Sequence, residues 1–235
     1  MKTAVWNFEF APPRGKAISE LRRRVTAVQP DVCILSEVRM DAVPAGHAIF
    51  AHSDWGYASH ARARKISLIS AHPWRETVQH TGGRPLQGRF VSGVTRVGPI
   101  DCVVIGICIP WSFCHVSSGQ RDQARWDEHK AFIRALPDAL DPITQSGLPV
   151  LLGGDFNHTF PRVKSDAEAH QMIVELLEDR DFKLATDAAP FEGRLLNHLA
   201  VRGLRCGDIL KLDNMSDGRQ LTDHIGVAAE LTPVA

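Results

Sequence analysis

The sequence lacks a surplus of charge of either sign, because 27 Lys and Arg residues balance 27 Asp and Glu residues. A protein that coats nucleic acid without sequence preference usually carries excess positive charge, since its affinity comes largely from neutralising phosphates. The balance therefore argues against tight binding along a polyanion. It does not argue against a local basic patch.

The sequence also lacks paired cysteine motifs and long apolar runs. Its cysteines are odd in number, lie mostly in apolar segments and show no CxxC spacing; they are Cys33, Cys102, Cys108, Cys114 and Cys206. Buried, reduced thiols indicate a reducing compartment. No segment is long enough to span a bilayer, and the N-terminus MKTAVWNFEF has no apolar signal core. We expect a cytoplasmic protein without membrane insertion, and nothing indicates an obligatory protein partner.

The composition and the order of elements predict one α/β domain over residues 1–235. Hydrophobic residues make up 44% of the chain and charged residues 23%, a balance typical of a globular protein with a substantial core. Strands and helices alternate early and a hairpin then interrupts them, a mixture that favours two packed sheets flanked by helices. The patterns predict strands at 3–7, 31–38, 65–74, 89–97, 100–110, 148–153, 195–201 and 225–231, and helices at 18–29, 120–140 and 166–177.

The segment LPVLLGGDFNHT carries the strongest chemical signal. An apolar strand ends in two glycines, which allow a sharp turn and close backbone approach. Asp155 and Asn157 follow two residues apart and face the same side if the chain stays extended. A carboxylate that orients water and an amide that binds a phosphate oxygen are what phosphate-ester hydrolysis needs. Taken alone, the pair is equally well explained as an Asx turn after a strand.

Three further polar positions lie at predicted strand boundaries. Glu37 follows the apolar run VCILS, where its carboxylate could reach a metal such as Mg²⁺, which prefers oxygen ligands. Asn7 ends the first strand, and the adjacent Asp223 and His224 precede the last one. Each is individually typical of an exposed turn. If the last strand runs antiparallel to the others, however, all four polar groups meet at one rim of the sheets.

The chain resembles the endonuclease/exonuclease/phosphatase superfamily, which has the deoxyribonuclease-I-like fold. The matching motifs come in the family's order and cover nearly the whole chain: VWN, PDVCILSEV, ISLISAHP, VVIGICIP, LLGGDFN, HLAVRGL and TDHIGVAAEL. The resemblance implies a four-layered α/β/β/α sandwich of two mixed sheets flanked by helices, with one active site along one edge.

The resemblance also implies roles for individual residues. Glu37 would be the chief ligand of Mg²⁺, with Mn²⁺ as an alternative ion, assisted by Asn7 and Asp223. Asp155 would orient or deprotonate the attacking water, and Asn157 would hold the scissile phosphate. His224 would stabilise the developing charge, while the metal polarises a phosphoryl oxygen.

Two positions depart from the family pattern. Many members place a catalytic His or Tyr at the end of the strand that here reads VVIGICIP, where this chain has Cys108, with His115 a little farther on. Members also commonly carry an Asp in the penultimate strand, where this chain has Asn197 followed by His198. Asparagine keeps the geometry of aspartate but loses its charge. These departures indicate a divergent member.

The sequence predicts a nuclease-like enzyme that hydrolyses a phosphodiester, and two alternatives remain open. A nuclease could use the basic segments 22–24, 62–65 and 84–89 on the phosphate backbone and Trp55, Trp74 and Trp111 to stack on bases, although buried aromatics are the commoner outcome. An esterase for a small nucleotide, sugar, inositol or lipid-headgroup phosphate is favoured by the neutral charge and short length. A non-catalytic binding module of the same fold is motivated by Cys108 and Asn197.

Overall fold

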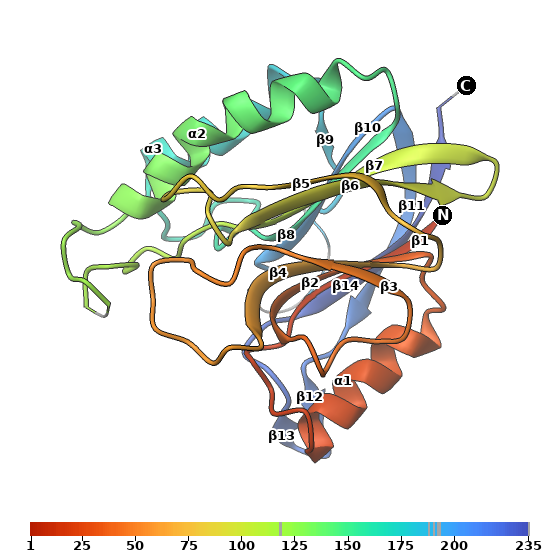
Figure 1. Ribbon diagram of the computed structural model, residues 1–235, viewed down its shortest axis with the longest axis horizontal. Helices are drawn as coiled ribbons and strands as arrows, with labels where there is room; N and C mark the ends of the chain where they lie inside the picture. Colours follow the sequence, from red (N-terminus) through yellow and green to blue (C-terminus); the bar gives the residue numbers. More distant parts are fainter. Residues whose placement is uncertain (118, 188, 190, 192–193, 235) are drawn as a thin grey trace.

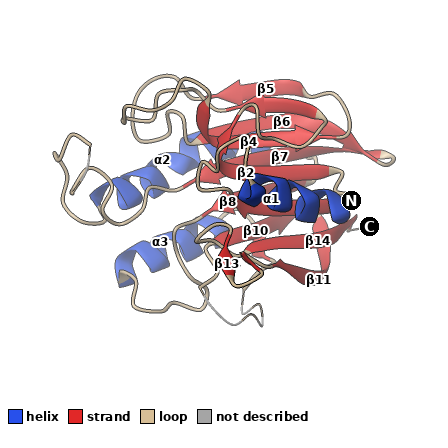
Figure 2. Ribbon diagram, turned by 90° about the horizontal axis from the view of Figure 1, so that it is seen from below, coloured by secondary structure: helices blue, strands red, loops and turns tan. Residues whose placement is uncertain are grey.

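The structure, a computed structural model, describes residues 1–117, 119–187, 189, 191 and 194–234. Two six-stranded sheets pack face to face, and helices cover both outer faces (Figure 1). This is the α/β/β/α sandwich that the sequence predicts. Helix α1 (Lys16–Ala27) covers one sheet, and α2 (Asp127–Thr144) and α3 (Ala167–Glu178) cover the other. Seen from below, α1 lies in front of the strands, with α2 and α3 to one side (Figure 2).

The first sheet has the strand order β11-β14-β1-β2-β4-β3. Only β1 and β2 are parallel among its described pairs, and β14 runs antiparallel to β1. Its strands are β1 (Lys2–Asn7), β2 (Val32–Arg39), β3 (His47–Phe50), β4 (Ala63–Ser70), β11 (Leu204–Leu212) and β14 (Gly226–Pro233).

The second sheet has the order β5-β6-β7-β8-β10-β9, in which β7 and β8 are the parallel pair. Its strands are β5 (Arg75–Gln79), β6 (Phe90–Val97), β7 (Ile100–Cys108), β8 (Val150–Asp155), β9 (Lys183–Leu184) and β10 (Asn197–Arg202). A separate two-stranded hairpin is formed by β12 (Met215–Ser216) and β13 (Arg219–Gln220).

Apolar side chains fill each interface between layers. Ile34 of the first sheet and Leu151 of the second belong to the core between the sheets. Helix α1 buries Ile18, Leu21 and Val25, the helically spaced positions that predicted it. Burial of such side chains, worth about 1.5–3 kcal/mol each relative to exposure, holds the layers together.

Several element boundaries differ from the sequence prediction. Helix α2 begins at Asp127 instead of Gln120, because Arg121 and Trp126 adopt positive φ angles of 58° and 74° that a helix does not accommodate. The predictions also omitted the strands β3, β5 and β11. Within the described residues, no helix combines the length and apolar character needed to cross a membrane.

The connectivity brings separate segments to one rim of the sandwich. Strands β1 and β8 end at Asn7 and Asp155, whereas β10 begins at Asn197 and β14 begins two residues after His224. Because β14 is antiparallel to β1 and β10 is antiparallel to β8, their starts lie beside those ends. The condition on which the convergence of the polar groups depended, an antiparallel last strand, is therefore met.

Candidate active site

Asp155 is fixed at the rim by its position between two neighbouring strands. It pairs with Cys108 of β7 on one side and Asn197 of β10 on the other. The preceding Gly154 has φ +138°, and a Cβ there would lie 1.9 Å from the carbonyl oxygen of Ile107. Only glycine fits this position, which explains the second glycine of the GGDFN motif.

The Asp155 carboxylate is buried and accepts three hydrogen bonds. Oδ1 accepts the backbone N–H of Asn157 at 2.9 Å, and Oδ2 accepts Nδ2 of Asn7 at 2.9 Å and Nδ2 of Asn157 at 3.2 Å. Burial raises the pKa of Asp155, the nearby charge of Glu37 raises it further, and His224 and the hydrogen bonds only partly oppose this. The site thus holds its central carboxylate as a stronger base than an exposed aspartate.

Glu37 lies within β2 at a break in its pairing with β4. Its φ of 47° is unusual for a non-glycine residue, and such strained conformations are found where the surrounding structure enforces them. Its Oε1 accepts a short hydrogen bond from Nζ of Lys65 on β4. Burial acts to raise the pKa of Glu37, but Lys65, His224 and Arg89 outweigh burial and hold the pKa below its ordinary value.

His224 enters the site from the segment before β14. Its carbonyl oxygen accepts Nε1 of Trp6 at 2.8 Å, which fixes the backbone. Its Nε2 lies 4.0 Å from Oδ2 of Asp155 and 3.2 Å from Oδ1 of Asp223. The side chain of Asp223 is 58% exposed, and its backbone N–H donates to Glu9 at 3.1 Å. Adjacent residues therefore face different surroundings, and only His224 points at Asp155.

We call Asn7, Glu37, Asp155, Asn157 and His224 the acid cluster. It offers carboxylate and amide oxygens, the hard donors that suit Mg²⁺. The negative charge of Glu37 is near enough to raise the pKa of Asp155. Beside them, Oδ1 of Asn197 is buried and has no hydrogen-bond partner among the described residues. These observations fit a divalent cation between Glu37 and Asp155.

The two asparagines of the acid cluster are already engaged within the protein. Oδ1 of Asn7 accepts the backbone N–H of Glu9 at 2.8 Å, which leaves one lone pair for another partner. Nδ2 of Asn157 donates to the carbonyl oxygen of Ile109 at 2.9 Å as well as to Asp155, and its φ is 48°. Contact of this amide nitrogen with a phosphate requires the release of one of these bonds.

The secondary candidates lie in two different environments. Burial raises the pKa of the Cys108 thiol to about 12, so it is neutral, and its side chain belongs to the core between the sheets. Nδ2 of Asn197 donates to the carbonyl oxygen of Ile225 at 2.9 Å, beside the acid cluster. His198 points to the opposite face, where its ring bonds Thr186 at 2.8 Å and burial lowers its pKa to about 4.

His115 belongs to a second group of side chains. Its Nδ1 lies 3.5 Å from Sγ of Cys114 and 3.3 Å from Oε1 of Glu128, and all three residues are buried. These three residues, here called the thiol cluster, place their ligand atoms within 4.8 Å of one another, close enough to hold a metal ion. Two arginines already bind the same atoms: Arg84 donates to Glu128 at 2.8 Å and Arg89 to Cys114 at 3.5 Å.

Sequence reasoning did not assign Lys65, Arg89 or Glu9 to the site. Lys65 and Arg89 lie within two basic segments that the sequence offered only as nucleic-acid contacts. Arg89 is 4% exposed and donates to the carbonyl oxygen of Cys108 at 3.4 Å. Only the antiparallel pairing of β2 with β4 brings Lys65 opposite Glu37, and no short motif encodes this pairing.

Solved structures with the same fold cover almost the entire chain. The human Nocturnin catalytic domain with bound sulfate has a TM-score of 0.72 at 14% identity, over 100% of this chain and 93% of that one. An endonuclease/exonuclease/phosphatase from Beutenbergia cavernae DSM 12333 has a TM-score of 0.69 at 16% identity, over 99% and 71%. The 3' phosphatase NExo from Neisseria, bound to a product DNA hairpin, has a TM-score of 0.62 at 18% identity, over 99% of each chain.

The sequence itself carries the family assignment. No curated protein matches the chain. The model of the endonuclease/exonuclease/phosphatase family, in contrast, matches residues 4–166, which include Asn7, Glu37, Asp155 and Asn157. This match spans more than half of the chain and agrees with the two-sheet sandwich and its polar rim. The chain therefore belongs to the endonuclease/exonuclease/phosphatase family.

Proposed function

We propose that the protein is a Mg²⁺-dependent hydrolase of phosphate esters that cleaves a phosphodiester bond at the acid cluster. Members of its family are generally hydrolases acting on phosphoesters. The observation that carries the proposal is the convergence of Glu37, Asp155 and His224 from three separate segments onto one rim. Two nearby carboxylates whose pKa values are shifted in opposite directions are typical of functional sites.

Glu37 would hold the divalent ion beside Asp155, with an oxygen of Asn7 as a further ligand. The bound ion would polarise a phosphoryl oxygen and screen negative charge. Lys65 neutralises Glu37 through its ammonium group, so it competes with the cation for the same carboxylate. Asp223 is exposed and bonds His224, which supports a role in orienting the imidazole more than a role as a metal ligand.

The reaction needs one proton acceptor and one stabiliser of charge. The oxygen of water bonds to phosphorus while the bond from phosphorus to the leaving oxygen breaks. Asp155 takes the proton from water, a task for which a raised pKa suits a carboxylate. His224 stabilises the charge that collects on the phosphoryl oxygens, and solvent returns a proton to the leaving oxygen. Asn157 orients Asp155 through two hydrogen bonds.

We extend the proposal to three broader properties. The five unpaired cysteines support a reducing compartment, and with it the cytoplasm. The continuous cores support treatment of residues 1–235 as one domain. The substrate is either nucleic acid or a small phosphate ester, and the balanced charge favours the small ester.

A panel of substrates tests the proposed activity. The purified protein would be incubated with Mg²⁺, and separately with EDTA, on bis(p-nitrophenyl) phosphate, p-nitrophenyl phosphate, single-stranded DNA and RNA. We expect Mg²⁺-dependent release of product from the diester. Absence of turnover on every substrate, together with no Mg²⁺ binding by calorimetry, would instead indicate a non-catalytic binding module.

A further inference from the structure

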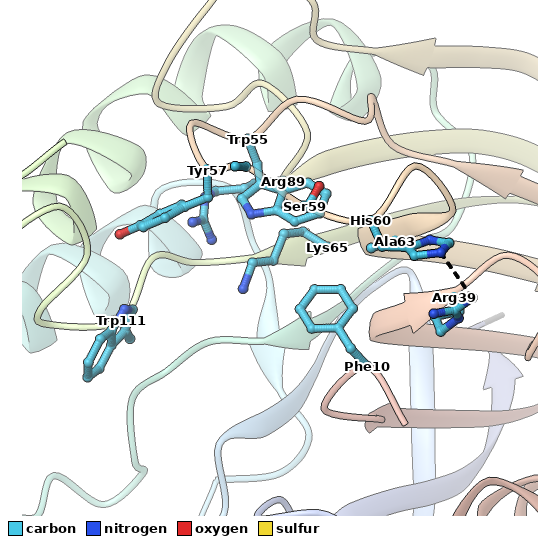
Figure 3. A pocket seen from close by; sticks show the side chains of 11 residues that line it. Phe10, Arg39, Trp55, Tyr57, Ser59, His60, Ala63, Lys65, Arg89 and Trp111 are labelled. Atoms are coloured by element: carbon cyan, nitrogen blue, oxygen red, sulfur yellow. Dashed lines mark hydrogen bonds between the residues drawn. The ribbon is translucent and has the colours of Figure 1, made fainter. Parts of the chain in front are cut away.

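A pocket of about 430 Å³ lies beside the acid cluster. Its lining comes from the chain after β1, the end of β2, the segment between β3 and β4, the start of β4, and single residues before β6 and after β7 (Figure 3). The lining residues are Phe10, Arg39, Trp55, Tyr57, Ala58, Ser59, His60, Ala63, Lys65, Arg89 and Trp111. Sites for small ligands are typically about 300–1,000 Å³ and mostly apolar with a few placed polar groups. The pocket has this size and this composition.

The pocket shares a wall with the acid cluster. Nζ of Lys65 lines the pocket and also bonds Oε1 of Glu37. The backbone N–H of Phe10 donates to the carbonyl oxygen of Glu37 at 2.6 Å. Arg89 bonds the carbonyl of Cys108, whose strand partner is Asp155. A group held against Lys65 and Arg89 therefore lies next to the carboxylates that we assign to catalysis.

Aromatic rings form the other walls. The ring of Trp55 stacks on that of Phe10, with centroids 5.9 Å apart and planes 13° from parallel. Trp111 is 47% exposed, so part of its ring is available for contact with a ligand. In Figure 3 the Lys65 ammonium group lies between Trp111 and Phe10, so that a cation faces the space between two aromatic surfaces.

Contacts with the thiol cluster fix the position of Tyr57, which lines the pocket. The Tyr57 hydroxyl donates to Sγ of Cys114 at 3.3 Å and accepts the backbone N–H of His115 at 2.6 Å. The Tyr57 ring also stacks on the imidazole of His115, with centroids 4.3 Å apart. A ring fixed in this way presents a rigid face to the pocket and loses little entropy when a ligand binds.

Three cations line the pocket, Arg39, Lys65 and Arg89, and among the described residues that line it none carries a carboxylate. Lys65 pairs with Glu37 and Arg39 with Asp41 just outside the lining, whereas Arg89 forms no ion pair with a carboxylate within the described part of the chain. The whole chain is neutral, so this positive charge is local. Cations next to aromatic side chains suit a ligand in which an anionic group is joined to a planar ring system.

We propose that this pocket binds a single nucleotide unit, with its phosphate on Lys65 and Arg89 and its base against Trp111. The inference rests on the proposed function, because it places that phosphate beside the acid cluster. It names the substrate class as small nucleotide esters rather than long nucleic acid. The pocket accommodates one base, and the neutral chain does not supply the extended basic surface that a polyanion requires.

Binding without turnover tests the proposal. Calorimetry in EDTA would compare AMP, ribose 5-phosphate and inorganic phosphate on the wild-type protein. Stacking of one base contributes enough that AMP should bind about tenfold or more tightly than ribose 5-phosphate. Trp111→Ala should remove most of this ratio and Trp111→Phe should retain it. Trp74→Phe serves as the control, since Trp74 lies outside the pocket and bonds the carbonyl of His47 at 2.7 Å.

Variants of Lys65 and Arg89 test the proposed binding of the phosphate. Lys65→Met should weaken AMP and ribose 5-phosphate by the same factor and leave their ratio unchanged. Arg89→Met should behave likewise, and circular dichroism would check its fold because Arg89 is buried. Equal affinities of the wild-type protein for AMP and ribose 5-phosphate, or an unchanged ratio in Trp111→Ala, would overturn the proposal.

Two further outcomes separate this inference from the proposed function. A single-stranded deoxyadenosine oligomer that binds more than about tenfold tighter than AMP would contradict a single-nucleotide site. If AMP binds as expected but bis(p-nitrophenyl) phosphate is not hydrolysed with Mg²⁺, the pocket stands and the hydrolase proposal fails. If bis(p-nitrophenyl) phosphate is hydrolysed with Mg²⁺ but AMP binds no more tightly than ribose 5-phosphate, the hydrolase proposal stands and the nucleotide pocket fails.

Discussion

The acid cluster and the thiol cluster are both buried groups of ionisable side chains, but their charges are balanced differently. In the thiol cluster, the single carboxylate, that of Glu128, pairs with Arg84, and the thiol of Cys114 contacts Arg89. In the acid cluster, Glu37 pairs with Lys65, whereas Asp155 accepts hydrogen bonds from uncharged amides and lies 4.0 Å from Nε2 of His224. The carboxylate of the thiol cluster thus has an arginine partner, whereas among the described residues Asp155 has no Lys or Arg partner.

This difference teaches that ligand types alone do not identify a metal site. Cys114, His115 and Glu128 have ligand atoms at suitable separations for a soft cation such as Zn²⁺. A cation there would have to displace arginines from atoms that they already satisfy. In the acid cluster, a divalent cation would relieve the repulsion between Glu37 and Asp155, so we place catalysis there.

Loss of the central carboxylate should produce the largest effect. Asp155→Asn should lower the rate of bis(p-nitrophenyl) phosphate hydrolysis with Mg²⁺ by about three orders of magnitude, within the range for removal of a general base. Initial-rate kinetics measures this effect. Glu128→Gln, the matched change in the thiol cluster, should leave the rate nearly unaltered. Similar losses of rate in Asp155→Asn and Glu128→Gln would contradict the assignment of catalysis to the acid cluster.

The second-largest expected difference between the clusters is in the dependence of the rate on Mg²⁺ concentration. Glu37→Gln should raise the Mg²⁺ concentration that gives half-maximal activity by about tenfold or more, because it removes a charged ligand. A Mg²⁺ titration of the rate checks this prediction. Cys114→Ser should not shift the curve, and a shift equal to that of Glu37→Gln would place the ion at the thiol cluster.

The elements that carry the site could be predicted from the sequence because their patterns are local. Apolar runs mark β1, β2, β8 and β14, and helical spacing of Ile18, Leu21 and Val25 marks α1. Strand β5 could not be recognised, since all five of its residues are exposed and no alternation is present. Such a strand depends on its pairing with β6, which is a tertiary contact.

The partners of the site residues were harder to predict than the residues themselves. Asp155 and Asn157 follow glycines after an apolar strand, a pattern visible in one segment. The role of Lys65 depends on the register between β2 and β4, and that of Arg89 on the approach of Cys108 and Cys114. Of the three tryptophans suggested for stacking, Trp55 and Trp111 line the pocket and Trp74 does not, a distinction that only the fold makes.

The ion pairs of the thiol cluster should matter for stability. Glu128→Gln should lower the free energy of unfolding by about 2 kcal/mol, because it removes the charge of a carboxylate that is only 7% exposed and pairs with Arg84. Asp122→Asn removes the other carboxylate on Arg84, but Asp122 is 44% exposed against 7% for Glu128. This control should cost about 0.5 kcal/mol. Urea unfolding measures both, and equal losses would contradict the assigned difference.

The smallest expected effect is a shift in the acid limb of the pH–rate profile. Burial raises the pKa of Asp155 above its ordinary value of 3.8, whereas the pKa of Glu37 lies below its own. A base acts only when deprotonated, so kcat/KM should fall as the pH drops through the pKa of Asp155, at a higher pH than for an exposed aspartate.

The charge around Asp155 determines where this limb lies. Removal of the Glu37 charge by Glu37→Gln favours ionisation of Asp155, and a higher Mg²⁺ concentration favours it in the wild-type protein. Both changes should therefore move the limb to lower pH, by about one unit or less. Glu128→Gln, in the charge-balanced thiol cluster, should leave the limb in place. The measurement is kcat/KM from pH 4 to 8. If neither a higher Mg²⁺ concentration nor Glu37→Gln moves the acid limb, a group other than Asp155 accepts the proton.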